Sequence, residues 1–190
     1  MKSKRSYELR AHSPDVTRMS NRPPEATSVF QPDLYVRDVF SLDLDLLTEL
    51  GVDTLLVDLD NTLLPRDSGD VSPEAKEWAK RAKDLGFKVC LVSNNWHARV
   101  EGVARELDLE LVAKAVKPLP FAFLIALRKL GSRRSTAATV GDQLFTDVLG
   151  GMLLGMKTVM VLPLSTSDLP HTLMLRRLER IALAGRKPLP

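Results

Sequence analysis

The sequence is short of cysteine and shows no pattern of a signal peptide or a membrane span, which excludes several classes of protein. Cys90 is the single cysteine among 190 residues, so no internal disulfide can form and a secreted disulfide scaffold is excluded. The basic amino-terminal stretch is not followed by the apolar run of a signal peptide. Residues 148–164 are apolar apart from Lys157, but their glycines predict a helix and a buried strand instead of a membrane span. We therefore expect a soluble, cytoplasmic protein.

The chain has no strong excess of either charge. Its 27 Lys and Arg residues against 24 Asp and Glu residues give a net charge of +3. Residues 1–30 and residues 168–190 each carry a net charge of +3, which leaves −3 for the part between them. Because the body is mildly acidic and only the ends are basic, we do not expect nucleic acid as a partner. Peripheral contact of the basic ends with an anionic membrane stays an open alternative.

The chain divides into a tail and one domain. Residues 1–32 are polar and basic, are interrupted by four prolines and show no apolar periodicity, which predicts a disordered tail. Residues 33–190 are long enough for a single domain with its own core. The last segment, 172–184, places its apolar residues near one face and predicts an amphipathic helix.

Predicted strands and helices alternate along this domain. Short apolar runs predict strands that are buried on both faces, and Ser72-Pro73-Glu74 has the residues of a helix start. The alternation predicts an α/β fold with one parallel sheet and helices on both faces, in which ligands bind at the carboxyl ends of the strands. The predicted strands are 54–58, 87–92, 110–113, 136–140 and 157–162, and the predicted helices are 42–50, 72–86, 97–107, 118–130 and 144–154.

Two acidic residues follow the strand predicted at 54–58. Asp58 and Asp60 stand two positions apart, directly after a buried strand. Their like charges are energetically costly there, because little water is present to screen them. One interpretation is an acidic turn, because Asp and Asn favour turns. The other is a metal and nucleophile site, in which Asp58 attacks and Asp60 serves as acid and then as base. The pair alone leaves both interpretations open.

The other strand ends carry residues that favour the second interpretation. Ser93 and Asn94 offer a hydroxyl and an amide that can hold a phosphate oxygen. Lys117 follows the third predicted strand, where a cation near an acidic cluster is electrostatically favourable. Lys114 is the competing candidate, but it lies earlier, within or just beyond that strand. Asp142 follows the next strand and is a hard oxygen ligand that suits Mg²⁺, and Asp147 lies five residues further on. No structural requirement explains this order of residues.

The joint pattern resembles the haloacid dehalogenase (HAD) superfamily. Its four motifs are matched in order by Asp58-Leu-Asp-Asn-Thr62, Ser93, Lys117 and Gly141-Asp142 with Asp147. Longer stretches at and before these motifs look like the YqeG-type subfamily IIIA phosphatases, which are similar to the phosphatidylglycerophosphate phosphatases. These stretches are residues 32–36, 57–64, 92–95, 117–118 and 141–151. The resemblance runs from about residue 31 to the predicted last helix. It implies a three-layer, Rossmann-like HAD fold.

The resemblance also implies catalytic and metal-binding roles. Asp58 is expected to be the nucleophile that becomes an aspartyl-phosphate, while Asp60 protonates the leaving oxygen and then activates water. Mg²⁺ is the expected cofactor, with Asp58, the backbone carbonyl of Asp60 and Asp142 as its ligands. Asp147 is expected to support the site by orienting Lys117 or a metal-bound water.

Four further residues complete the expected substrate site. By the same resemblance, Thr62 steadies the catalytic loop, Ser93 and Asn94 hold phosphate oxygens, and Lys117 neutralises charge on the nucleophile and the phosphate. One position departs from the family pattern, because Met152 stands where relatives usually have Asn. That departure leaves the fine specificity open.

The spacing of the motifs leaves no room for a cap domain. Asn61 to Val92 spans 32 residues and Asn94 to Val116 spans 23, and each gap is already filled by a predicted loop, helix and strand. An uncapped site favours a bulky or membrane-borne phosphate ester, and phosphatidylglycerophosphate is the leading expectation. The alternatives are a cytosolic phosphatase for a nucleotide, sugar phosphate or phosphoprotein, and a binding or scaffold protein without turnover. Trp96 either borders the open cleft or packs on the sheet.

Overall fold

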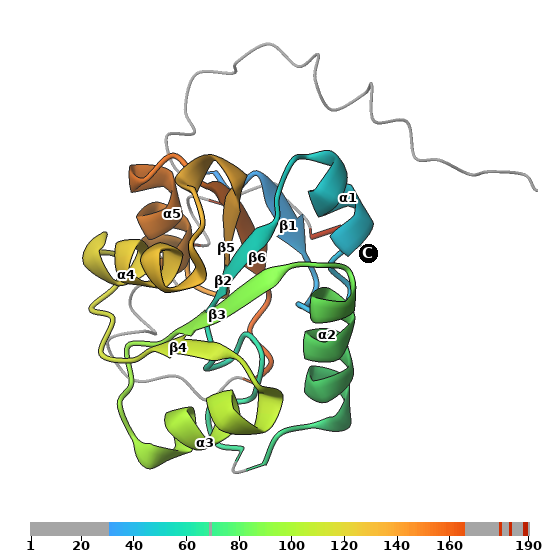
Figure 1. The fold of residues 1–190 in the computed structure, drawn as a ribbon, viewed down its shortest axis with the longest axis vertical. Coiled ribbons are helices and arrows are strands. Elements are labelled where there is room, and N and C mark those ends of the chain that lie inside the picture. Colours follow the sequence, from blue (N-terminus) through green and yellow to red (C-terminus); the bar gives the residue numbers. More distant parts are fainter. Residues whose placement is uncertain (1–30, 69, 166–178, 180–182, 184–187, 190) are drawn as a thin grey trace, which may run out of the picture.

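Six parallel strands form one open sheet in the order β1-β6-β5-β2-β3-β4 (Figure 1). The computed structural model describes residues 31–165 except 69, together with residues 179, 183, 188 and 189. The predicted α/β fold with a parallel sheet is therefore confirmed. The tail predicted at 1–32 lies almost wholly outside the described residues, as does most of the helix predicted at 172–184.

The strands and helices alternate along the chain as expected. The strands are β1 (Leu34–Val36), β2 (Thr54–Val57), β3 (Lys88–Val92), β4 (Glu110–Val112), β5 (Ala137–Gly141) and β6 (Lys157–Val161). The α-helices are α1 (Leu44–Glu49), α2 (Pro73–Asp84), α3 (Ala98–Leu107), α4 (Phe121–Leu130) and α5 (Leu149–Leu153). The side chain of Ser72 accepts a hydrogen bond from the N–H of Ala75 and caps α2, so this predicted helix start is present.

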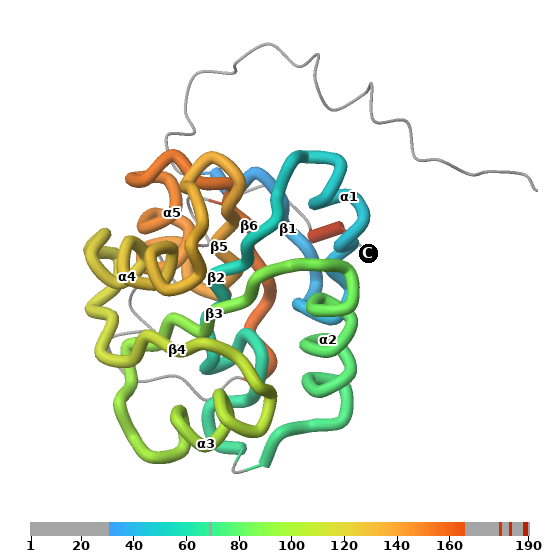
Figure 2. The backbone as a smooth tube through the Cα atoms, in the orientation of Figure 1, coloured from blue at the N-terminus to red at the C-terminus, as the bar shows by residue number. Residues whose placement is uncertain are grey.

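Helices cover both faces of the sheet and produce three layers (Figures 1 and 2). Helices α1, α2 and α3 lie on one face, and α4 and α5 lie on the other. Side chains alternate along β2: Leu55 and Val57 enter the core under α1–α3, while Leu56 packs in the core that contains Phe123 of α4. Burial on both faces explains why β2 reads as an unbroken apolar run.

One strand was missed, and one helix begins later than predicted. The edge strand β1 was not predicted, because three residues are too few to show a period and its partner β6 lies more than 120 residues away in the sequence. Helix α4 begins at Phe121 and not at Pro118. Pro120 disfavours the helical conformation of the residue before it, so the helix can begin only after this second proline.

The helix predicted at 144–154 consists of two pieces. A π-helical turn spans Leu144–Val148, and α5 follows it. Gly150 and Gly151 allow α5 to approach its neighbours, because an added Cβ would meet the ring of Phe123 at Gly150 and the side chain of Thr139 at Gly151. The backbone N–H of Leu144 donates to the buried carboxylate of Glu179 over 2.7 Å.

Within the described residues, no separate cap domain stands over the sheet. The chain between β2 and β3 is a loop followed by α2, and the chain between β3 and β4 is α3 with its connections. The carboxyl ends of the strands are therefore not enclosed by an inserted domain. None of the helices among the described residues is long and apolar enough to cross a bilayer.

Candidate active site

The carboxyl ends of β2 and β5 place two of the predicted acids side by side. The backbone N–H of Asp58 donates to the carbonyl of Val140 over 2.9 Å, which extends the pairing of the two strands into the catalytic loop. Asp142 follows β5 directly, and its Oδ1 accepts a hydrogen bond of 3.4 Å from Oγ1 of Thr62. Asp58, Asp142 and Thr62 are all buried. Thr62 therefore connects the loop after β2 to the acid after β5.

Lys117 joins two of these acids by direct ion pairs. Its Nζ lies 2.5 Å from Oδ1 of Asp58 and 2.6 Å from Oδ1 of Asp147, and all three side chains are buried. Burial alone would lower the pKa of Lys117, but Asp147 and Asp58 together raise this pKa above its ordinary value. The ammonium therefore stays charged beside Asp58, which is the state that a phosphate site needs.

The loop after β4 delivers Lys117 to the acids through an unusual backbone. Lys114 and Val116 both have positive φ, at 53° and 52°, and a β-branched residue such as Val116 rarely adopts this conformation. The side-chain Oδ1 of Asn94 accepts a hydrogen bond of 2.8 Å from the backbone N–H of Lys117. Lys114, the sequence alternative to Lys117, is exposed and lies over the ring of Trp96 instead of near the acids.

Three carboxylates form a cluster that fits a divalent cation. Asp58, Asp142 and Asp147 each offer one oxygen, and these oxygens lie within 4.8 Å of one another. Oδ2 of Asp58 is buried without a hydrogen-bond partner in the described part of the chain. The three carboxylates and the Lys117 ammonium together carry a formal charge of −2. Hard oxygen donors with this charge suit Mg²⁺.

Burial is the main cause of the shifted pKa of Asp58, and the neighbouring acids add to it. Burial raises the pKa of Asp58 to about 8, with Lys117 opposing the rise and Asp147 and Asp142 adding to it. A bound divalent cation would offset that burial and favour the ionised carboxylate. The residues present therefore fit a metal beside Asp58.

The carboxylate of Asp60 points to different partners from those of Asp58. Its Oδ2 accepts a hydrogen bond of 2.5 Å from Nδ2 of Asn95, and its Oδ1 lies 2.8 Å from a guanidinium nitrogen of Arg99. The Asp60 carboxylate is thus outside the cluster formed by Asp58, Asp142 and Asp147. The expected metal role of Asp60 rested on its backbone carbonyl, so this placement leaves that prediction as it stands.

Asn95 and Arg99 are site residues that the sequence interpretation missed. Arg99 also donates to the carbonyls of Ser68, over 2.6 Å, and Pro65, over 2.9 Å, and so holds the loop between β2 and α2 against the site. One signal was available: Arg99 stands in the first turn of α3, where the helix dipole disfavours a cation. A basic residue in that position suggests a nearby acid to compensate.

Ser93 and Asn61 shape the remaining wall of the site. Ser93 is buried, and its Oγ accepts a hydrogen bond of 3.1 Å from the N–H of Asn95. Asn61 has a φ of 65°, a conformation that Asn tolerates better than most residues. Its carbonyl accepts a hydrogen bond from the N–H of Leu164, and its side-chain oxygen accepts one from the hydroxyl of Ser165. The segment after β6 therefore holds the loop after β2 in place.

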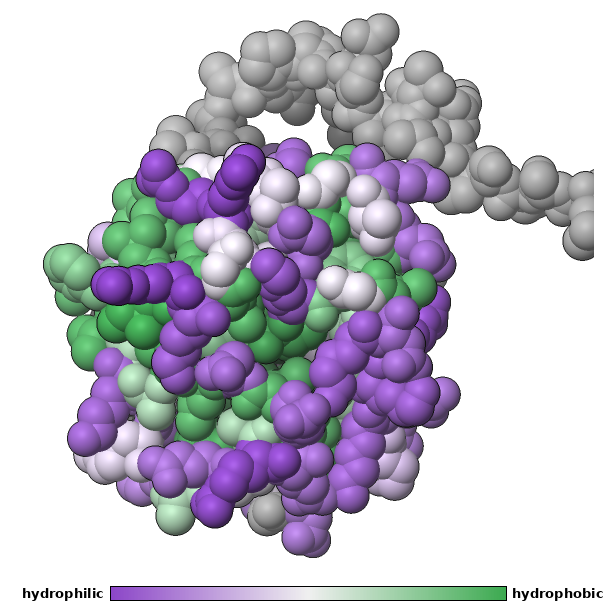
Figure 3. All heavy atoms as spheres, in the orientation of Figure 1, coloured by the Kyte–Doolittle hydropathy of each residue, from purple (hydrophilic) through white to green (hydrophobic). Residues whose placement is uncertain are grey.

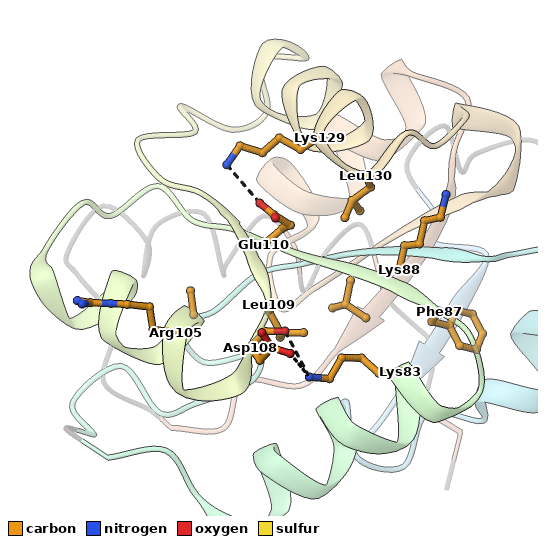
Figure 4. A pocket seen from close by; sticks show the side chains of 11 residues that line it. Lys83, Phe87, Lys88, Arg105, Asp108, Leu109, Glu110, Lys129 and Leu130 are labelled. Carbon is orange, nitrogen blue, oxygen red and sulfur yellow. Dashed lines mark hydrogen bonds and ion pairs between the residues drawn. The ribbon is translucent and has the colours of Figure 1, made fainter.

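A groove of about 600 Å³ lies away from this cluster (Figure 4). It is lined at the amino ends of β3 and β4, opposite the strand ends that carry the acids. Lys83 donates there to the last carbonyls of α3, and Lys129 donates to the carbonyl of Leu111. These lysines satisfy backbone carbonyls near helix and strand ends. The groove therefore has a structural explanation that requires no ligand.

Comparison with known proteins agrees with this geometry. The profile of the haloacid dehalogenase-like hydrolases matches residues 29–155. The chain is 37% identical over 158 residues to the "Probable phosphatase YqeG" of Bacillus subtilis, which covers 83% of this chain and 92% of that protein. It is 31% identical over 105 residues to the ribulose-1,5-bisphosphate 5-phosphatase of Halopiger xanaduensis, covering 50% of this chain and 44% of that protein.

A third relative is a plant protein that the chain matches more weakly. The chain is 25% identical over 162 residues to phosphatidylglycerophosphate phosphatase 1 of Arabidopsis thaliana, covering 80% of this chain but 46% of that protein. The chain belongs to the haloacid dehalogenase-like hydrolases. The predicted resemblance is thus confirmed, and the family together with these relatives confirms the expectation of a phosphatase.

Proposed function

We propose that the protein is an Mg²⁺-dependent phosphomonoester hydrolase that works through an aspartyl-phosphate on Asp58. The observation that carries this proposal is the buried contact of Lys117 with both Asp58 and Asp147. It holds a charged ammonium beside the nucleophile at the carboxyl edge of the sheet. Phosphoryl transfer depends mainly on such positioning and charge neutralisation.

Asp58 and Asp60 divide the chemistry of the first step. A carboxylate oxygen of Asp58 attacks the phosphorus and forms the new P–O bond. The bond from phosphorus to the ester oxygen breaks, and that oxygen leaves with its electron pair and a proton from Asp60. Each oxygen of Asp60 accepts one hydrogen bond in the structure and keeps a second lone pair, which can carry this proton.

The second step returns the enzyme to its first state. Asp60 takes a proton from a water molecule, the water oxygen attacks the phosphorus, and the bond to Asp58 breaks. Asn95 and Arg99 both donate hydrogen bonds to Asp60 and so fix the direction in which its carboxylate points. Inorganic phosphate leaves and Asp58 is again a carboxylate.

The phosphate group is held by residues from three strand ends. Ser93 and Asn94 bind phosphate oxygens in this proposal, Lys117 neutralises their charge, and Thr62 steadies the loop through its contact with Asp142. Asp58, the carbonyl of Asp60 and Asp142 would hold Mg²⁺, which when bound supplies a further positive charge to the phosphate.

We infer that the substrate is a bulky phosphate ester, with phosphatidylglycerophosphate as the leading candidate. Two observations support this choice: the described residues place no cap over the strand ends, and one relative is named for this lipid. A soluble sugar phosphate is the second candidate, because another relative is named as a sugar bisphosphatase. The family favours either enzyme over a scaffold without turnover.

The test is phosphate release from four esters, with and without Mg²⁺. The panel contains phosphatidylglycerophosphate in detergent micelles, ribulose bisphosphate, a nucleoside monophosphate and a phosphopeptide. Asp58→Asn is measured beside Asp84→Asn, a control that removes an exposed carboxylate of α2. We expect Mg²⁺-dependent release from the lipid, which Asp58→Asn abolishes and Asp84→Asn leaves intact.

Each alternative has its own result in that panel. Release from the soluble esters alone would replace the lipid with a small substrate. Release that persists fully in a chelator would overturn the metal requirement. Full activity of Asp58→Asn would contradict the assignment of the nucleophile.

A further inference from the structure

Exposed hydrophobic side chains gather beside the candidate active site. Six of the eleven large hydrophobic residues that are exposed in the described chain lie on the loop after β3, on the loop after β4 and on α4. Phe121 is 67% exposed, Val116 63% and Trp96 61%, so most of each residue is accessible to solvent. We call this set the α4 surface; its members are Trp96, Val116, Leu119, Phe121, Leu124 and Ile125.

The members of the α4 surface are continuous with one another. A hollow of about 260 Å³ is lined by Trp96, Lys114 and Val116 together with Asn94. A second hollow of about 220 Å³ shares Lys114 and Val116 and extends to Phe121 and Ile125. Figure 3 shows hydrophobic residues gathered over the side of the molecule where α4 lies, at the left of the view. Exposed apolar surface in one connected patch marks an interaction site more often than scattered residues do.

The exposed face of α4 has the residue order of a helix that lies on a membrane. Phe121, Leu124, Ile125 and Arg128 follow one another at the spacing of a single helix face, and all four are exposed. The opposite face, with residues such as Phe123, packs into the core. Aromatic and aliphatic side chains next to a basic residue are typical of helices that bind at the membrane interface.

The exposed charges on and beside α4 are mainly basic. From Leu111 to Gly141 the sequence has no acidic residue and six basic ones, of which Lys117 is buried among the acids of the site and Lys129 lies 3.5 Å from Glu110. Lys114, at 5.7 Å from the ring centre of Trp96, adds a cation beside the indole, a combination that favours the headgroup region of a bilayer. Apolar side chains beside Lys114 and Arg128 complement an anionic lipid leaflet, which offers both negative charge and an apolar layer.

The α4 surface also reaches the catalytic residues. Val116 immediately precedes Lys117, and Asn94, which lines the first hollow, accepts the hydrogen bond from the backbone N–H of Lys117. A phosphate at the lysine would therefore lie at the border of the apolar patch. That arrangement suits an ester whose phosphate is polar and whose remaining part stays in a lipid layer.

We propose that the α4 surface binds an anionic membrane leaflet and thereby presents the active site to a phosphorylated lipid headgroup. This inference rests on the proposed function for its substrate, but the binding itself does not require turnover. It also assigns the membrane contact to α4 and its flanking loops, in addition to any contribution of the basic ends of the chain.

The test uses the full chain and vesicles of two compositions. Vesicles of phosphatidylglycerol and phosphatidylcholine are compared with pure phosphatidylcholine in a sedimentation assay. The variant is Phe121→Glu with Ile125→Glu, and the matched control is Leu50→Glu with Leu85→Glu, which changes two comparably exposed leucines at the ends of α1 and α2. Circular dichroism and thermal melting establish that both variants are folded.

We expect the wild type and the control to bind the anionic vesicles, and the α4 variant to lose more than about tenfold in partitioning. Brominated lipid should quench the fluorescence of Trp96 in a Trp78→Phe protein that is otherwise wild type, because this substitution removes the second tryptophan. Equal binding of the α4 variant, or no binding by the wild type, would overturn the proposal.

Two further readouts separate this proposal from its rivals. One rival outcome is that light scattering shows a dimeric wild type and a monomeric α4 variant, while vesicles are not bound. In that case the surface is an interface between copies of this chain and the proposal is wrong. Phosphate release from soluble esters should be equal in the wild type and the α4 variant. If no ester is hydrolysed while vesicle binding still depends on α4, the proposed function fails and the membrane surface stands.

Discussion

Arg99 donates a hydrogen bond of 2.8 Å to Oδ1 of Asp60, and it holds the carbonyls of Pro65 and Ser68 at the same time. The acid–base residue of the proposed mechanism is therefore attached to α3 and not only to its own loop. Asp60 is 5% exposed, and the side chain of Arg99 is 24% exposed. This pairing is shielded enough from water to fix the direction of the Asp60 side chain.

Removal of the arginine should impair catalysis more than substrate binding. We expect Arg99→Gln to lower kcat about 10- to 100-fold, because a displacement of roughly 1 Å at a catalytic group has this effect. The KM should change little, because Arg99 contacts Asp60 and the loop between β2 and α2 and not the residues proposed to bind phosphate. Steady-state kinetics provide the measurement. Arg105→Gln on the same helix is the control, and an unchanged kcat in Arg99→Gln would contradict the positioning role.

Gly141 is needed because the Asp147 carboxylate occupies the space that a side chain would fill. An added Cβ at Gly141 would overlap the side chain of Asp147, which also accepts from the N–H of Gln143. We expect Gly141→Ala to displace Asp147 from Lys117, to lower kcat, and to reduce the free energy of unfolding by about 1–3 kcal/mol. Chemical denaturation and phosphate release measure the two effects.

Gly102 supplies the matched control for that substitution. It lies within α3, and no atom approaches the position of an added Cβ within 4 Å. Gly102→Ala should therefore keep full activity and gain up to about 1 kcal/mol of stability from helix propensity. Equal behaviour of the two glycine variants would show that Asp147 does not depend on the space at Gly141.

Mg²⁺ should stabilise the folded protein through the acidic cluster. At a concentration near 100 times its Kd, a ligand adds about 2.7 kcal/mol, which corresponds to a rise of about 5 to 10 °C in Tm for a chain of this size. Thermal melting in a chelator and in Mg²⁺ measures this rise without reference to activity. Asp142→Asn should reduce it strongly, and a rise that is equal in Asp142→Asn would place the cation elsewhere.

The Mg²⁺ effect should grow as the pH rises. Burial raises the pKa of Asp58 from 3.8 in the unfolded chain to about 8. Without metal, the unfolded chain therefore loses this proton at a lower pH than the folded protein, and the free energy of unfolding falls progressively between about pH 4 and pH 8. Protons and the cation compete for the same oxygens. The rise in Tm should therefore be larger at pH 8 than at pH 6, and the reverse order would contradict the assignment of Asp58 as a ligand.

Much of the site was predictable because its residues follow buried strands directly. Asp58 and Asp142 each follow an apolar run, and parallel strands bring their carboxyl ends to one edge. The position of Lys117 depended on a loop with two positive φ values, which no residue pattern indicates. The spacing of the motifs nevertheless selected it over Lys114, and the structure places Lys117 among the acids.

The parts that were missed depend on contacts between distant segments. Arg99 meets Asp60 across 39 positions of sequence, and only the packing of α3 against the loop after β2 creates that contact. The strand β1 likewise exists because β6 offers it a partner. The start of α4 was wrong by three residues, because the second proline, Pro120, outweighed Pro118 as the helix boundary.

The most direct test of the central claim is to trap the phosphoryl group on Asp58. The enzyme is quenched in acid during turnover with Mg²⁺ and its substrate, and the digested peptides are examined by mass spectrometry. We expect the peptide that contains Asp58 to gain the mass of one phosphoryl group, and hydroxylamine to remove it. The Asp58→Asn protein should show neither the adduct nor phosphate release. An Asp58→Asn protein that releases phosphate at the wild-type rate, with no modified peptide in either protein, would contradict it.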